Sequence, residues 1–191
     1  MDERDLGRTL LTIARSAIAE GLGFSPLGQP SHEALRQPAA TFVTLKNSGE
    51  LRGCIGSLKP IRPLGVDVRE NAIAAAFRDP RFPPLAAIEF EATSVEVSLL
   101  SADERVDVAD EEDLVARLRP GLDGLVLEYG RHRATFLPQV WEALADPREF
   151  LAALKRKAGL PGDFWSPLVD VSRYSVTKWT ESEFRMSEDV R

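Results

Sequence analysis

Residues 40–58 read ATFVTLKNSGELRGCIGSL, and this stretch predicts the central hairpin of the fold. Ala40–Lys46 carries the β-branched and aromatic residues that are typical of a strand, and the next four residues, Asn-Ser-Gly-Glu, are typical of a turn. We therefore expect Ala40–Lys46 to pair with Leu51–Ser57. This pairing places Cys54, the only cysteine of the chain, on a strand.

Helical and extended patterns alternate along the rest of the 191 residues, with no internal repeat. An apolar stripe predicts a first helix from about Leu6, which ends near Gly21 and Gly23. The other elements that we expect are a helix containing Ala72–Ala76, an irregular loop at Asp79–Pro84, a strand at Thr93–Leu99, a helix at Glu112–Leu118, a hairpin of Leu125–Tyr129 with Arg133–Leu137, a helix capped by Asp146, and an extended segment at Val169–Trp179. Hairpins mixed with helices indicate an α+β fold with an antiparallel sheet flanked by helices.

Composition excludes several classes of function. The formal net charge is −6, and nucleic-acid binding depends on clustered Lys and Arg, so we expect no nucleic-acid partner. No apolar run is long enough to cross a membrane, and the first residues lack the features of a secretory signal. Because a lone free thiol suits a reducing compartment, we expect a cytoplasmic protein. Neither metal-ligand spacing nor a nucleotide fingerprint is present, so we expect no metal and no cofactor.

The Cys54 motif has the ingredients of a reactive site. Side chains two residues apart share a face of a strand, so Arg52 is expected beside Cys54, where its charge would favour the thiolate. Gly53 and Gly56 would let a ligand lie against the backbone. The alternative is that Cys54 fills a tight core and that the glycines mark a bulge.

A nucleophilic thiol normally also needs a base, and the sequence offers no obvious one. Neither His32 nor His132 has a context that places it near Cys54. Glu96 is the better candidate, because it lies with Ser98 on the polar face of an otherwise apolar strand.

Two charged residues have structural alternatives to a role in a site. Glu96 can act in acid–base chemistry or form a salt bridge to Arg52 or Arg81. Arg81 can bind a carboxylate or phosphate of a ligand, or it can hold its own proline-rich loop through Asp79, which we favour.

Several blocks of sequence resemble the AMMECR family, also called protein A of the AmmeMemoRadiSam system. The blocks are Phe42–Leu45, Leu51–Gly56, Asp79–Phe82, Val95–Ser98, Phe136–Val140, Phe150–Leu151, Lys157–Leu160 and Trp165. The resemblance implies one AMMECR-type domain over residues 1–191, with two unequal lobes and a cleft between them. The larger lobe would come from both chain ends and the smaller lobe from the middle. Thr44 and Gln139 match family positions that are expected to line the cleft.

The resemblance implies partners rather than a reaction. Prokaryotic members of the family are associated with a Memo-like protein and a radical S-adenosylmethionine protein. We therefore consider two hypotheses. Either the protein is an enzyme that uses Cys54 on a small or modified metabolite, or it is a non-catalytic recognition or scaffold module that binds a protein or peptide through the same motif.

Overall fold

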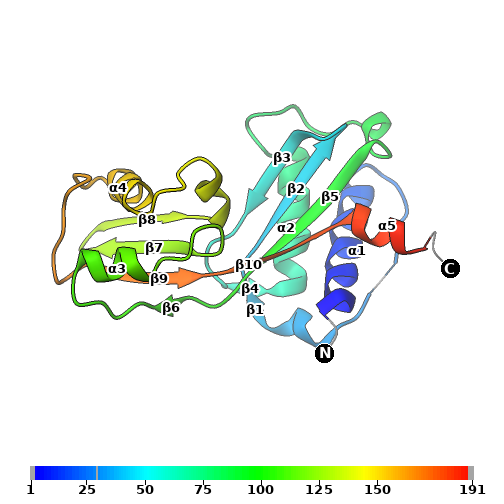
Figure 1. Cartoon of the computed structure of the whole chain (residues 1–191). Coiled ribbons are helices and arrows are strands. Elements are labelled where there is room, and N and C mark those ends of the chain that lie inside the picture. The colour runs from blue at the N-terminus through cyan, green and yellow to red at the C-terminus, as the bar shows by residue number, and fades with distance from the viewer. Residues whose placement is uncertain (1–2, 29, 189–191) are drawn as a thin grey trace. The chain divides into compact units, whose positions relative to one another are not determined.

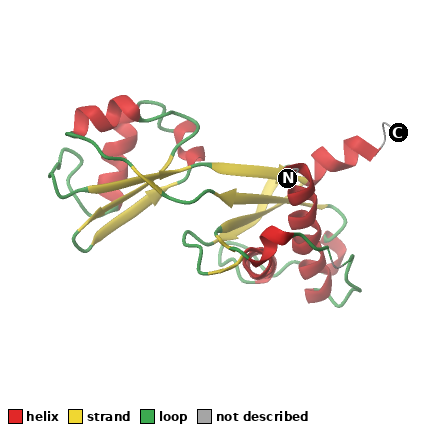
Figure 2. Ribbon diagram, turned by 90° about the horizontal axis from the view of Figure 1, so that it is seen from below, coloured by secondary structure: helices red, strands yellow, loops and turns green. Residues whose placement is uncertain are grey.

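The protein, described by a computed structural model over residues 3–28 and 30–188, divides into two compact units (Figures 1 and 2). Unit 1 is formed by the chain up to Leu100 and again from Thr177 onward, and unit 2 is formed by Ser101–Val176. The predicted α+β class with antiparallel sheets flanked by helices is confirmed. No helix within the described residues is long and apolar enough to span a membrane.

Unit 1 combines helices with a small and a larger antiparallel sheet. Its helices are α1 (Glu3–Gly21), α2 (Leu64–Phe77), α5 (Glu181–Glu188) and two 3₁₀ helices at Glu33–Arg36 and Ala87–Glu89. Its strands are β1 (Pro38–Ala39), β2 (Thr41–Asn47), β3 (Glu50–Gly56), β4 (Arg62–Pro63), β5 (Thr93–Leu100) and β10 (Val176–Thr180), the last of which begins at the end of unit 2. In the described part of the chain, β1 pairs with β4, and the larger sheet has the order β10-β5-β2-β3.

The core of unit 1 lies between the larger sheet and two helices. Alternation along β2 and β5 turns Val43, Leu45, Val95 and Val97 to one face, where they are fully buried. That face is covered by α1, which packs against β5, and by α2, which packs against β2 and β3 (Figure 1). We call the opposite side of this sheet the outer face; β2 turns the half-buried side chains of Phe42, Thr44 and Lys46 to it.

Helix α2 approaches the sheet closely because its buried stripe is made of small residues. Ala72, Ala75 and Ala76 bring its backbone next to β3, where a Cβ placed on Gly53 would lie 2.2 Å from the carbonyl oxygen of Ala75. Glycine is therefore the residue that allows this strand and this helix to pack together.

Unit 2 has its own sheet and its own core. Its sheet has the order β6-β9-β7-β8 and is accompanied by two α-helices and a 3₁₀ helix. These elements are β6 (Glu104–Arg105), α3 (Glu111–Arg117), β7 (Gly124–Tyr129), β8 (His132–Phe136), the 3₁₀ helix Pro138–Glu142, α4 (Pro147–Lys157) and β9 (Asp170–Tyr174). The core includes Trp141, whose ring stacks on Phe150 with 3.8 Å between centroids. As expected, Asp146 caps α4 by accepting the N–H groups of Arg148 and Glu149.

The segment that we predicted as one extended run, Val169–Trp179, is two strands. β9 belongs to the sheet of unit 2 and β10 to that of unit 1, and Ser175 lies between them. Ser175 exchanges hydrogen bonds with Ser101: the N–H of Ser101 donates to the Ser175 carbonyl at 2.9 Å, and the N–H of Ser175 donates to the Ser101 hydroxyl at 3.0 Å. The interruption therefore falls where the chain changes units.

We predict that Gly53→Ala lowers the free energy of unfolding by about 1–3 kcal/mol, since the new methyl group would collide with backbone that cannot rotate away. Urea denaturation of unit 1 would measure the change. The matched control is Gly65→Ala in α2, where a Cβ meets only ordinary contacts at 3.5 Å or more and helix propensity improves. Equal stability of Gly53→Ala and the parent would contradict the close approach of α2 to β3.

Candidate functional site

Cys54 lies in a row of three residues that crosses the sheet of unit 1. It is opposite Thr44 on β2, and Thr44 is opposite Glu96 on β5. Directly opposed residues turn their side chains to the same face, so all three lie on the outer face. The hydroxyl of Thr44 donates to the Cys54 sulfur at 3.3 Å. Cys54 is half-buried.

Arg52, which we predicted beside Cys54, forms an ion pair with Glu89. Its Nε donates to Glu89 Oε1 at 2.8 Å, and the hydrogen bond with Glu89 raises the pKa of Arg52. The reason is a β-bulge: Leu45 pairs with Gly53 and Lys46 pairs with Leu51, so Arg52 is the extra residue of β3. We placed Arg52 beside the thiol from the two-residue spacing of a regular strand, and that spacing does not hold across a bulge.

Arg81 is the cation that contacts Cys54. Its Nη2 donates to the Cys54 carbonyl at 3.1 Å, and the Cys54 N–H donates to Asp79 Oδ2 at 2.9 Å. Asp79 and Arg81 also form an ion pair at 2.7 Å, as the favoured alternative predicted. Asp79 raises the pKa of Arg81, and the negative charge of a Cys54 thiolate contributes in the same direction.

The carboxyl group of Asp79 is held ionised by its neighbours. Hydrogen bonds from Arg81, together with one from the Cys54 N–H, hold the pKa of Asp79 far below its usual range, although burial opposes the shift. Because this carboxylate occupies the Cys54 N–H, that amide is not available to stabilise an oxyanion in the way that a nucleophile's own N–H often does.

Glu96 forms a salt bridge, but with a partner that we did not predict. Lys46 Nζ donates to Glu96 Oε1 at 2.8 Å, in place of Arg52 or Arg81. The side chain of Glu96 is 14% exposed, so the pair satisfies a carboxylate that would be costly to bury alone. Ser98 lies two residues further along β5, opposite Phe42.

The two glycines of the motif are explained by packing. The space beside Gly53 holds the Ala75 carbonyl, and a Cβ on Gly56 would lie 2.3 Å from the ring of Phe42. The room that we expected a ligand to use is thus filled by the protein itself. Gln139 is an exposed residue of unit 2, in the 3₁₀ helix Pro138–Glu142.

Both histidines have local structural contacts. His32 caps a 3₁₀ helix, because its Nδ1 accepts the N–H of Ala34 at 3.1 Å. His132 lies 2.9 Å from the Ala158 carbonyl through Nδ1, within unit 2. Within the described residues, no three His, Cys, Asp or Glu side chains form a group that could hold a metal ion.

A buried polar cluster that we did not predict lies at the end of the Cys54 strand. Asp67 of α2 is fully buried and accepts hydrogen bonds from the backbone and hydroxyl of Thr41, the hydroxyl of Ser57, the guanidinium of Arg62 and the amide of Asn71. Asp67 and Asn71 lie four residues apart in the apolar stripe of α2, and polar residues in such a stripe are the signal that could have revealed the cluster.

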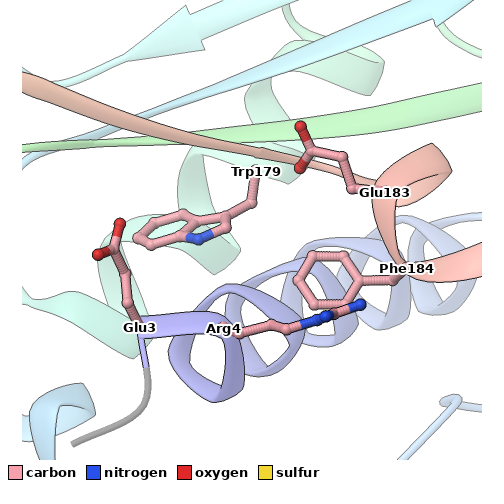
Figure 3. A pocket seen from close by; sticks show the side chains of 5 residues that line it. All are labelled: Glu3, Arg4, Trp179, Glu183 and Phe184. Carbon is pink, nitrogen blue, oxygen red and sulfur yellow. The ribbon is translucent and has the colours of Figure 1, made fainter. Parts of the chain in front are cut away.

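A hollow of about 510 Å³ lies elsewhere in unit 1, beside α1 and α5 (Figure 3). The rings of Trp179 and Phe184 and the side chains of Glu3, Arg4 and Glu183 line it. Trp179 packs against Gly7 of α1, where a Cβ would lie 2.4 Å from the indole ring. The guanidinium of Arg4 lies 5.7 Å from the centre of the Phe184 ring, so a cation–π contact already occupies part of the hollow.

The geometry defines an α+β protein with a strand-borne cysteine whose peptide group is held by an ion pair. The chain belongs to the AMMECR1 family, whose model matches residues 11–179. The matched range contains Cys54 and all the residues that contact it, whereas most of the lining of the hollow in Figure 3 falls outside it.

Relatives match nearly the whole chain. A protein of Methanothermobacter thermautotrophicus is 44% identical over 182 residues, which cover 91% of this chain and 93% of that protein. Protein MJ0810 of Methanocaldococcus jannaschii is 41% identical over 184 residues, with coverage of 94% and 92%. The crystal structure of the uncharacterized protein PH0010 from Pyrococcus horikoshii is similar, with a TM-score of 0.76, 36% identity, and coverage of 92% of this chain and 91% of that one.

We predict that Asp79 stabilises unit 1 in a pH-dependent way. Its native pKa is depressed, so its stabilising contribution is complete above the ordinary carboxyl pKa of about 3.9 and is lost as pH falls from there toward the lower native value. Urea denaturation at a series of pH values should therefore show a stability difference between the parent and Asp79→Asn that shrinks on acidification. Asp163→Asn, at an exposed position, is the control. A difference that does not change with pH would contradict the ion pair.

Proposed function

We propose that the protein is an enzyme that uses the thiol of Cys54 as a nucleophile or covalent handle on a small or modified metabolite. The observation that carries the proposal is the hydrogen bond from the Thr44 hydroxyl to the Cys54 sulfur. A donor at this position stabilises a thiolate more than a neutral thiol. The guanidinium of Arg81 lies beside the same residue and donates to the Cys54 carbonyl at 3.1 Å.

The arrangement constrains the chemistry that such a thiol would perform. Addition of the Cys54 sulfur, as thiolate, to a carbonyl carbon would form a carbon–sulfur bond, break the carbon–oxygen π bond and leave the electron pair as negative charge on the carbonyl oxygen. The Cys54 amide already binds Asp79, so another donor would have to receive that charge. Glu96 is the acid–base candidate on the same face, opposite Thr44, where it is paired with Lys46.

We predict that iodoacetamide alkylates Cys54 in the folded protein near neutral pH. Thr44→Val, which removes the hydroxyl and keeps the shape, should lower the rate roughly fivefold, the factor that corresponds to a hydrogen bond of about 1 kcal/mol. Mass spectrometry of the modified chain would measure the rate. Ser94→Ala, at an exposed position of β5, is the control and should react like the parent. Reaction of Cys54 only after denaturation would end the nucleophile proposal.

A second candidate function is a recognition or scaffold module, and the pairing of charges favours it. Arg52 is paired with Glu89, Arg81 with Asp79, and Lys46 with Glu96. In the part of the chain that the structure describes, these carboxylates are engaged by cations instead of being left as bases. Paired charges at the border of a sheet can give specificity to a protein contact. The Memo-like and radical S-adenosylmethionine proteins are the partners that we propose.

The two functions predict opposite results for charge reversal and thiol removal. If the protein is a recognition module, Arg81→Glu should abolish capture of the purified Memo-like or radical protein in a pull-down, whereas Cys54→Ala should bind as the parent does. Arg69→Glu, which reverses an exposed charge paired with Glu20 on the helices, is the control. Capture that survives Arg81→Glu would count against this function.

A further inference from the structure

The backbone of β3 has an open side. Among the strands of the described residues, β3 has a neighbour only on the side of β2. Such an edge presents N–H and C=O groups to which another extended chain can add. In an antiparallel pair, alternate residues turn both of these groups away from the partner strand. Cys54 is one of them, because its N–H and its carbonyl bind Asp79 and Arg81 instead of β2.

Asp79 and Arg81 together supply one hydrogen-bond acceptor and one donor, which are the groups that one residue of an adjoining strand would supply. The carboxylate accepts the Cys54 N–H at 2.9 Å, and the guanidinium donates to the Cys54 carbonyl at 3.1 Å. These are ordinary distances for backbone hydrogen bonds in a sheet.

The pair is fixed in position by its own contacts. Arg81 donates to both carboxylate oxygens of Asp79, through Nε at 3.0 Å and Nη2 at 2.7 Å, and its backbone N–H donates at 3.1 Å. The side chain of Asp79 is 1% exposed, whereas that of Arg81 is 52% exposed. The buried carboxylate is thus held in place. The more exposed guanidinium covers the Cys54 carbonyl on the free side of β3.

The loop that carries this pair cannot itself continue the sheet. Pro80, Pro83 and Pro84 have no N–H to donate, so a regular ladder of backbone bonds cannot form along the loop. The side chains of Asp79 and Arg81 therefore make the hydrogen bonds to β3 that the backbone of this loop cannot make.

We propose that the Asp79–Arg81 ion pair is a side-chain substitute for a further strand, and that it prevents β3 from pairing with β3 of a second copy of this chain. Two identical edges are complementary when they run antiparallel, because a two-fold axis places the outward N–H groups of each copy opposite outward carbonyl groups of the other copy. Leu51, which is 42% exposed on this strand, would be covered in such a pair. Since the pKa of Asp79 is far below its usual range, the block persists at every physiological pH.

The test is to remove the guanidinium and measure self-association. Arg81→Ala should raise the weight-average mass in sedimentation velocity with increasing concentration, toward roughly twice that of the parent species. A reductant is present throughout, so that Cys54 disulfides do not contribute. The matched control is Arg69→Ala, which loses the same charge from an exposed salt bridge with Glu20 and should sediment like the parent.

Hydrogen–deuterium exchange measures whether the edge of β3 is open in the variant. In dilute Arg81→Ala, the amide of Cys54, whose acceptor Asp79 loses its anchoring guanidinium, should exchange roughly tenfold faster than in the parent, and protection should return as concentration rises. Faster exchange without any increase in mass would overturn the proposal, because the edge would be open and yet unpaired. If Arg81→Ala does not fold, Asp79→Asn replaces it, since it keeps the shape and loses the ion pair. Equal association of Asp79→Asn and Arg69→Ala would then overturn the proposal.

Discussion

The hydrogen bonds of one buried carboxylate hold the hairpin of unit 1 on its helix. Asp67 has no exposed surface, and an isolated carboxylate in that position would cost several kcal/mol. The cost is offset because Thr41 at the start of β2, Ser57 just after β3, and Asn71 on α2 all donate to it. Both strands are thereby tied to α2 at the open end of the hairpin, in one register. Every contact of Cys54 depends on that register, because a slip of one residue would turn Cys54 to the helices and Gly53 to the outer face.

Elements whose signals are local could be predicted from the sequence. The turn at Asn47–Glu50, the alternation in Thr93–Leu99 and the Asp146 cap each depend on neighbouring residues, and the structure confirms the elements that they define. The bulge at Arg52 could not be predicted in this way, because it results from the fit of β3 to β2 and α2. The break at Ser175 depends on Ser101, which is distant in the sequence.

The candidate site could be predicted in its centre but not in its partners. Cys54 and Thr44 are on one face because strand alternation places them there, and the sequence shows that alternation. Proximity in sequence favoured Arg52 as the neighbouring cation, whereas the loop returns Arg81 to the strand from 27 residues away. For Glu96, the need for a salt bridge was clear from its position, but the choice of Lys46 depends on which diagonal neighbour lies on the next strand.

The hydrogen bonds between Ser101 and Ser175 also have a consequence for the order in which the two units fold. Ser101 and Ser175 are hydrogen-bonded, so the segment between them leaves and re-enters unit 1 at nearly one point. β5 and β10 are neighbours in the sheet, although the whole of unit 2 separates them along the chain. Closing a flexible loop of that length costs on the order of 4 kcal/mol in entropy. A unit 2 that folds first brings its two ends together and removes most of that cost. A folded unit 2 would therefore hold the end of β5 and the start of β10 close enough to pair.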